Sequence, residues 1–233
     1  MLLVRQSRTR RGPVLSVHNQ SKENRDMAKI GIMGGTFDPI HNGHLLLGRQ
    51  AHQEYGLDEI WFMPSGDPPH KKDHPITDAV ARCDMVRLAI AGEPAFRLSE
   101  FEVRRPGNTY TSETLQLLAE KYPHHTFFFI AGADSIYEIE QWNRPELVMA
   151  RTVFLVAARE YEQAESSLAQ QIQYLEHRYH ADIRLLHCQE IHISSNELRR
   201  MESRGKALCN YMPEAVARYI EAHGLYQEEQ NEQ

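Results

Sequence analysis

The sequence contains few cysteines and no long apolar segment. Cys83, Cys188 and Cys209 are odd in number and far apart, so they form neither a disulfide framework nor a Cys-x-x-Cys zinc motif. We therefore expect them to be small buried hydrophobic residues in a reducing, cytoplasmic compartment. The longest apolar runs, 127–131 and 153–158, are far shorter than the roughly 20 residues that cross a bilayer. The sequence thus predicts no membrane span.

The chain also has no excess of positive charge. Its 26 Lys and Arg residues face 32 Asp and Glu residues, which gives a formal net charge of −6. Because phosphate neutralisation supplies much of the affinity for nucleic acid, we expect no nucleic-acid partner. A chain of 233 residues is long enough to bury a core without disulfides or a structural metal. We expect one globular domain, as a monomer or a small homo-oligomer.

The charge is distributed unevenly along the chain. Residues 1–26 contain six basic and two acidic side chains and show no hydrophobic periodicity, and Met27 directly precedes the first apolar run. Two interpretations stay open: a genuine basic tail, such as a targeting segment, or an extension upstream of a start at Met27. Either way we expect 1–26 to be disordered, 27–226 to form the domain, and 227–233 to be a polar acidic tail.

Within 27–226, apolar runs alternate with amphipathic segments. Strands are predicted at 29–33, 59–64, 126–131, 152–157 and 182–187, and helices at 44–55, 78–91, 111–121, 145–149, 163–179, 195–202 and 213–223. Continuous apolar strands are typical of a sheet that is covered on both faces. The alternation predicts an open, parallel α/β sheet, whose ligands bind at the carboxyl ends of its strands.

The richest motif follows the first predicted strand. It reads Gly34-Gly35-Thr36-Phe37-Asp38-Pro39-Ile40-His41-Asn42-Gly43-His44. The two glycines let the backbone turn tightly and approach a ligand. A helix that opens near Gly43 directs free N–H groups to the same place. His41 and His44 are three residues apart, so both imidazoles project to one side. The arrangement suits a polyphosphate.

Other interpretations of this motif are weaker. It lacks the Gly-Lys-Ser/Thr of a P-loop and the Gly-x-Gly-x-x-Gly fingerprint. Two histidines at this spacing also suit zinc, but no cysteine or carboxylate at a suitable spacing completes a ligand set, so no protein-held metal is predicted. A purely structural turn is the remaining alternative. Asp38 is predicted to brace the turn rather than to perform acid–base chemistry.

The string 35–44 resembles the signature of the nucleotidyltransferases with a His-x-Gly-His motif. Ile193-Ser194-Ser195-Asn196-Glu197-Leu198-Arg199 resembles the Ile-Ser-Ser-x-x-x-Arg motif of the same superfamily. Further stretches are similar to the bacterial nicotinate-nucleotide adenylyltransferases: Pro68-Pro69-His70-Lys71, the run 108–115, Ala131-Gly132-Ala133-Asp134 with Trp142, and 212–226. The resemblance runs from about Lys29 to Tyr226. It implies a Rossmann-like, doubly wound sheet of nucleotidyltransferase type with a C-terminal helical segment.

The chain departs from the family pattern at two single positions and in one loop. Asn196 stands where members usually have Thr or Ser, and Leu198 stands where they have Ile. Both substitutions look tolerable, since Asn also suits a helix start. After Arg159 the family tends to continue with Pro-Gly, whereas this chain continues with Glu160-Tyr161. That difference affects one loop and neither main motif.

The resemblance implies that ATP and nicotinate mononucleotide react to give nicotinate adenine dinucleotide (deamido-NAD) and pyrophosphate, with Mg²⁺ arriving on ATP. The attacking phosphate monoester has a second pKa of about 6, so it is already ionised at neutral pH and needs no general base. The protein must instead align the reactants and neutralise phosphate charge.

The resemblance also implies roles for particular residues. His44 would donate to the α-phosphate, His41 would hold the phosphates, and Arg199 would bind the β- and γ-phosphates with support from Ser194 and Ser195. The other predicted substrate contacts are Gly34, Gly35, Thr36 and Phe37 along the cleft, Lys71 on a phosphate, Thr109 and Tyr110 beside the pyridine carboxylate, Gly132 with Asp134 at a ribose, and Trp142 stacked on the pyridine ring. The alternatives are that Trp142 only fills the core and that Lys71 is only a solvated surface charge.

Rival functions remain. Nicotinamide mononucleotide differs from the nicotinate form by one charge, so a nicotinamide or dual-specificity enzyme is the main alternative. Pantetheine-phosphate adenylyltransferases carry Thr where this chain has His41, and cytidylyltransferases have a different second motif. A non-catalytic nucleotide-binding regulator could have lost its phosphate-contacting groups, but all of them are present.

Overall fold

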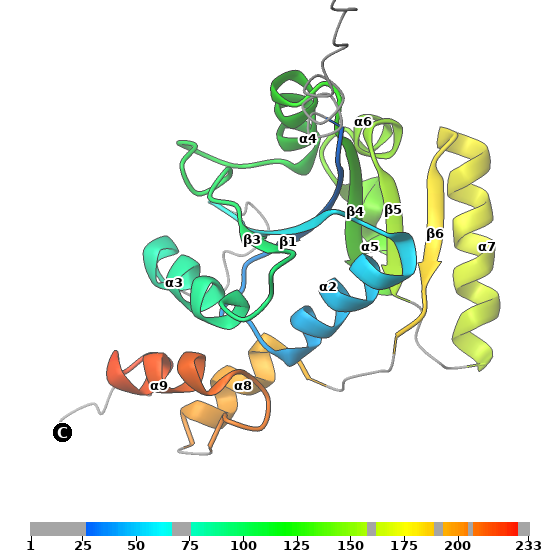
Figure 1. The fold of residues 1–233 in the computed structure, drawn as a ribbon. Helices are drawn as coiled ribbons and strands as arrows, with labels where there is room; N and C mark the ends of the chain where they lie inside the picture. Colours follow the sequence, from blue (N-terminus) through cyan, green and yellow to red (C-terminus); the bar gives the residue numbers. More distant parts are fainter. Residues whose placement is uncertain (1–26, 67–75, 158–161, 189–192, 205–206, 228–233) are drawn as a thin grey trace, which may run out of the picture.

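The computed structural model describes residues 27–66, 76–157, 162–188, 193–204 and 207–227. Its centre is a six-stranded parallel sheet in the order β3-β2-β1-β4-β5-β6 (Figure 1). The strands are β1 (Lys29–Gly35), β2 (Glu59–Pro64), β3 (Phe96–Leu98), β4 (Thr126–Gly132), β5 (Val153–Ala157) and β6 (Asp182–Leu186). The predicted parallel α/β sheet is confirmed. Residues 1–26, Lys71, the loop after Arg159 and residues 228–233 lie outside the described residues.

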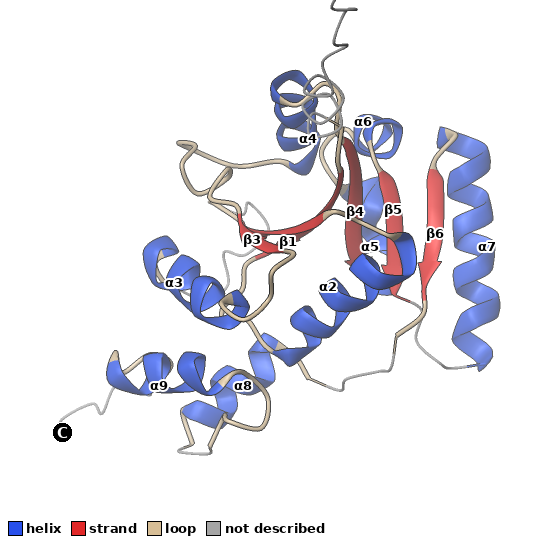
Figure 2. Cartoon of the chain, viewed as in Figure 1, coloured by secondary structure: helices blue, strands red, loops and turns tan. Residues whose placement is uncertain are grey.

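The helices alternate with the strands (Figure 2). They are α2 (Asn42–Tyr55), α3 (Ala79–Ile90), α4 (Thr111–Lys121), α5 (Ala133–Glu138), α6 (Pro145–Arg151), α7 (Glu162–Tyr179), α8 (Ser195–Glu202) and α9 (Glu214–Ala222), with a single 3₁₀ turn η1 (Ile139–Gln141) after α5. Gly56, in the left-handed region at φ 58°, ends α2 as its glycine predicts. Asp78 caps α3, because its Oδ1 accepts from the Val80 N–H at 2.8 Å.

The sheet separates two hydrophobic cores. Strand β4 shows the division: Phe127 and Phe129 belong to one core, and Phe128 and Ile130 belong to the other. Buried side chains of α2, α3, α8 and α9 complete the core of Phe128, while those of α4 to α7 complete the core of Phe127. Because both faces are covered, the strands read as continuous apolar runs. The fold is the doubly wound, Rossmann-like one that the resemblance implies.

Several features differ from the predictions. Strand β3 was not predicted, because it has three residues of which only Phe96 is buried. Helix α5 and η1 were not predicted either, because they have six and three residues, too few to show a periodic apolar pattern. The cysteine prediction holds for Cys83, which is buried, but is wrong for Cys209, which is exposed. Within the described ranges, no helix is both long and apolar enough to cross a membrane.

The strand order places a candidate site at one edge of the sheet. Strand β1 pairs with β2 on one side and with β4 on the other, so the chain changes direction across the sheet between β1 and β4. In such sheets the carboxyl ends of the strands at this point leave a crevice for ligands. Strand β1 ends at Gly35 and β4 ends at Gly132. The predicted phosphate motif therefore begins at the expected place.

Candidate functional site

A cavity of about 400 Å³ lies at the carboxyl ends of β1 and β4. Seven residues that the sequence assigned to substrate binding line it: Gly34, Gly35, Thr36, Thr109, Tyr110, Gly132 and Trp142. They come from two strand ends, from the start of α4 and from the turn η1, which are far apart in the chain. The fold thus brings most of the predicted substrate residues together around one hollow.

Gly34 and Gly35 play a different local role from the predicted one. They are the last two residues of β1 rather than the turn itself. A Cβ atom on Gly34 would lie 3.4 Å from the Phe129 ring, and one on Gly35 would lie 3.2 Å from the Phe37 ring. The missing side chains leave room for these rings and let the backbone border the cavity. The positive φ that the turn requires falls on Phe37, at 51°.

Phe37 supports the site rather than lining the cleft. Its side chain is 2% exposed and is absent from the cavity wall. Its ring packs edge-on against the His44 imidazole, with 5.0 Å between ring centroids. The prediction that Phe37 lines the cleft is therefore wrong, because the left-handed backbone turns its ring into the core.

The two histidines of the motif lie together at the start of α2. His41 immediately precedes the helix and His44 belongs to its first turn. Their ring centroids are 3.8 Å apart, and the His41 N–H donates to His44 Nδ1 at 3.3 Å. Both imidazoles therefore project to one side, as their spacing predicts. Since Nδ1 of His44 accepts a hydrogen bond, the neutral ring carries its proton on Nε2.

His41 is the more buried histidine of the pair. Its side chain is 6% exposed, and Nδ1 has no hydrogen-bond partner among the described residues. Burial lowers the pKa of His41 from its usual 6.5 to about 4. The ring is therefore neutral near pH 7.

This burial predicts a pH-dependent stability. Between pH 6.5 and about 4 the unfolded chain binds a proton at His41 that the folded chain does not bind. The free energy of unfolding therefore falls as the pH falls through this window, by up to about 3 kcal/mol from this group. His41→Asn, which does not titrate there, should have a flatter profile in urea unfolding at pH 7 and pH 4.5. His223→Asn, which removes an exposed histidine, is the control and should keep the wild-type pH dependence. If His41→Asn loses as much stability between pH 7 and pH 4.5 as the wild type does, the lowered pKa of His41 is contradicted.

The second motif forms the start of α8. Ser194 caps the helix: its Oγ accepts from the Glu197 N–H at 3.2 Å, and the Glu197 carboxylate accepts from the Ser194 N–H at 2.9 Å. The Ser195 hydroxyl donates to the Pro39 carbonyl at 2.9 Å. These hydroxyls hold the helix start and the glycine-rich loop.

Arg199 joins the two motifs. Its Nη1 donates to the Asp38 carbonyl at 2.7 Å, and its Nη2 donates to Asn196 Oδ1 at 3.4 Å. The side chain is half-buried and lies one turn into α8. Asn196 thus supports Arg199, and Leu198 is fully buried, so both departures from the family pattern fit the fold.

Asp38 braces the motif loop, as predicted. It is 2% exposed, and its carboxylate accepts from the Tyr226 hydroxyl at 2.6 Å and from the Thr77 N–H at 3.3 Å. Burial, followed by the charge of Asp38, raises the pKa of Tyr226, so its hydroxyl keeps its proton and donates. The C-terminal segment is therefore tied to a loop near the N-terminal strand.

Trp142 and Asp134 take different positions. Trp142 is half-buried, lines the cavity and packs edge-on against Phe129 with 5.9 Å between centroids. Asp134 is exposed in the first turn of α5 and does not line the cavity, although its neighbours Gly132 and Ser135 do. Trp142 thus lies where stacking on a ligand is feasible, while Asp134 lies at the rim.

The sequence did not indicate several residues of the site. Ser65, Glu102 and Asn143 also line the cavity. The Glu102 carboxylate accepts from the hydroxyls of Thr114 at 2.7 Å and Thr109 at 3.3 Å. The pKa of Glu102 is raised, because burial outweighs the lowering effect of these two hydrogen bonds. Glu102 lies in an irregular segment where no periodic pattern singles it out. For metals, no group of three or more His, Cys, Asp or Glu residues in the described ranges is placed to bind an ion.

The comparisons with known proteins agree with this geometry. Residues 32–201 match the family model described as cytidylyltransferase-like. A probable nicotinate-nucleotide adenylyltransferase of Lachnoclostridium phytofermentans is 42% identical over 200 residues, which cover 86% of this chain and all of the relative. The nicotinate-nucleotide adenylyltransferase of Bacillus subtilis is 37% identical over 201 residues, with the same coverage.

A solved structure shows the same fold. The nicotinic acid mononucleotide adenylyltransferase of Plasmodium falciparum complexed with NaAD superposes with a TM-score of 0.71 at 22% identity, covering 85% of this chain and 97% of that one. The two relatives above are similar to this chain over their whole length, so they identify its family more narrowly than the shared fold does. The chain therefore belongs to the nicotinate-nucleotide adenylyltransferase family, within the cytidylyltransferase-like superfamily.

Proposed function

We propose that this protein transfers the adenylyl group of ATP to nicotinate mononucleotide, which gives deamido-NAD and pyrophosphate in the synthesis of NAD. One observation carries the proposal. Arg199 contacts the Asp38 carbonyl of the glycine-rich loop at 2.7 Å, so the two phosphate motifs meet beside a cavity that Trp142 lines.

The reaction needs alignment more than acid–base chemistry. A phosphate oxygen of the mononucleotide attacks the α-phosphorus of ATP, the bond between that phosphorus and the bridging oxygen breaks, and pyrophosphate leaves with the electron pair. The His44 ring donates through Nε2–H to the α-phosphate as charge develops there. His41, whose buried ring is neutral near pH 7, holds the phosphates beside it.

Positive charge comes from other groups. The Arg199 guanidinium pairs with the β- and γ-phosphates. The amino-terminal ends of α2 and α8 point their N–H groups and the positive ends of their dipoles toward the same phosphates. An Mg²⁺ ion that arrives bound to ATP would add to this neutralisation of phosphate charge.

The acceptor occupies the cavity of about 400 Å³. Trp142 stacks on the pyridine ring, and the carboxylate lies against Thr109 and Tyr110 at the start of α4. Tyr110 is the N-cap of α4 and makes no capping bond with its side chain, so the first-turn N–H groups there suit a carboxylate. The backbones of Gly34, Gly35, Thr36 and Gly132 border the substrates, and Asp134 holds a ribose hydroxyl at the rim.

Substitution of Trp142 tests the acceptor pocket. Trp142→Ala should raise the KM for nicotinate mononucleotide about tenfold or more, because an aromatic stack on a base contributes roughly 1–3 kcal/mol. The KM for ATP should change little, and Trp142→Phe should retain part of the affinity. Trp61→Ala, which removes the other tryptophan from outside the cavity, is the matched control. If Trp142→Ala lowers the thermal stability but leaves the KM for nicotinate mononucleotide unchanged, the indole only packs in the core and the proposed stacking is contradicted.

The function itself is tested by product analysis. The protein is incubated with ATP, Mg²⁺ and nicotinate mononucleotide, and products are identified by mass spectrometry together with a pyrophosphate assay. We expect deamido-NAD and pyrophosphate in equal amounts, and loss of both when EDTA removes Mg²⁺. Binding of ATP without either product would favour a nucleotide-binding regulator and overturn the proposal.

A further inference from the structure

Helix α3 carries a buried arginine that the proposed mechanism does not use. Arg82 is 2% exposed and shares the apolar face of the helix with Met85, Val86 and Ala89. A charged side chain is rarely buried to this degree without specific partners. The helix contacts β2, β3 and α9, and Figure 1 shows it between β3 and α9.

All the described hydrogen-bond acceptors of this guanidinium are backbone carbonyls. Nε donates to Thr77 O at 2.9 Å, Nη1 donates to Thr36 O at 2.8 Å, and Nη2 donates to Ser65 O at 2.9 Å and more weakly to Gly66 O at 3.4 Å. Thr36 follows β1 and Ser65 follows β2, and both line the substrate cavity. One side chain therefore ties two walls of the cavity to a single helix.

The bond to Thr36 fixes a strained peptide. The peptide plane between Thr36 and Phe37 is set partly by the φ of Phe37, which is 51°. A bulky residue rarely adopts this left-handed conformation unless its surroundings hold it there. In a trans peptide the N–H points opposite to the C=O. Since Arg82 binds the Thr36 carbonyl, the Phe37 N–H faces away from Arg82.

The same geometry applies at β2, where the bond to the Ser65 carbonyl turns the Gly66 N–H away from Arg82. Lysine could not replace these contacts, because an ammonium group is a compact point charge whereas a guanidinium has five donors in a fixed plane. Burial lowers the pKa of Arg82, and the nearby Asp38 opposes this effect. The Asp38 carboxylate itself bonds to Tyr226 and Thr77, which leaves the fork of Arg82 for the carbonyls.

We propose that Arg82 is a positioning residue for adenylyl transfer, which holds the Thr36 and Ser65 peptides in the orientation that the substrates require. It touches no substrate and acts through these two loop peptides. The inference rests on the proposed function, since it concerns the same cavity.

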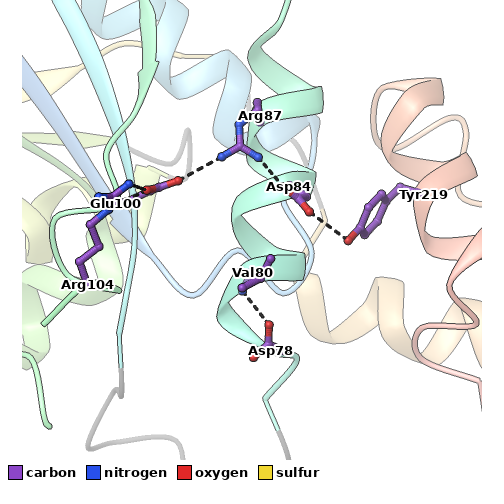
Figure 3. A network of polar contacts seen from close by, with 7 residues as sticks. All are labelled: Asp78, Val80, Asp84, Arg87, Glu100, Arg104 and Tyr219. Carbon is purple, nitrogen blue, oxygen red and sulfur yellow. Dashed lines mark hydrogen bonds and ion pairs between the residues drawn. The ribbon is translucent and has the colours of Figure 1, made fainter. Parts of the chain in front are cut away.

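The test compares Arg82→Lys with a matched variant on the same helix. Arg87 is exposed and bonds to Asp84 and Glu100 on the surface (Figure 3). Arg82→Lys keeps the charge but cannot reach three carbonyls. We expect its kcat/KM for nicotinate mononucleotide to fall about 10²-fold, the scale for small misplacements of reacting groups. Arg87→Lys should stay within about twofold of the wild type, because exposed ion pairs contribute little.

The measurement must separate positioning from stability. Thermal unfolding is recorded for each variant, and kcat and both KM values are then measured at a temperature where all variants are fully folded. A large loss in fully folded Arg82→Lys supports the inference. A wild-type kcat and KM at that temperature, with only a lower Tm, overturns it. Failure of the proposed function is distinct: it would appear as a wild-type protein that forms no product with nicotinate mononucleotide, and the inference would fail with it.

Discussion

His44→Ala should lower kcat by about 10²–10³-fold while the chain still folds, since this is the usual effect of losing one donor to a developing negative charge. The reason is the tautomer of the ring. The His41 N–H donates to Nδ1 of His44 at 3.3 Å, so the proton of His44 is on Nε2 and points away from that bond. Steady-state pyrophosphate release at saturating substrates measures the effect directly.

The same substitution has a small structural cost. It removes the hydrogen bond at the start of α2, and loss of such a capping bond costs about 1 kcal/mol. For a domain of this size that lowers Tm by a few degrees only. His223→Ala, which removes an exposed histidine of the C-terminal region, is the control for general loss of an imidazole. Turnover near the wild-type value in a folded His44→Ala protein would contradict the role of His44.

Arg199→Met should raise the KM for ATP and lower kcat/KM about 10- to 100-fold. A hydrogen bond from a charged donor to phosphate contributes about 1.5–3 kcal/mol, and methionine keeps the aliphatic stem without the donors. The KM for nicotinate mononucleotide should change less, because Arg199 lies at the junction of the two phosphate motifs rather than in the wall of the cavity. Initial rates over a matrix of both substrates separate the two constants.

The neighbouring residue supplies the control. Arg200 is exposed on the same helix, so Arg200→Met changes the charge equally and should leave both KM values within about twofold. The KM for ATP of Arg199→Lys should lie between those of Arg199→Met and the wild type. Lysine keeps the charge but lacks the guanidinium group that binds Asp38 and Asn196. An unchanged KM for ATP in Arg199→Met would show that the residue only ties α8 to the loop.

The predictable part of the fold is the part that local sequence determines. The continuous apolar run at 127–131 predicts a strand covered on both faces, and β4 has that environment. The helix predicted at 195–202 forms, and the capping box between Ser194 and Glu197 begins it. Strand β3 is different, because its three residues become a strand only through pairing with β2.

The candidate site likewise has features that local sequence predicts and features that it does not. The three-residue spacing of His41 and His44 is enough to place both imidazoles on one side. Nothing local indicates that the Ser195 hydroxyl binds Pro39, which lies 156 residues earlier in the chain. Arg82 does leave a trace, because it interrupts an apolar helix face. Its carbonyl acceptors, however, are set by the arrangement of three loops and no periodicity predicts them.

The proposed pocket prefers an acidic acceptor, and a comparison of two acceptors measures this preference. kcat/KM is measured for nicotinate mononucleotide and for nicotinamide mononucleotide under identical conditions with ATP and Mg²⁺. We expect a preference of about 10- to 100-fold or more for the nicotinate form, because only its carboxylate makes charge-assisted bonds at the start of α4. Equal rates with both acceptors, or faster turnover of the amide, would contradict a pocket at Thr109 and Tyr110 that recognises the carboxylate.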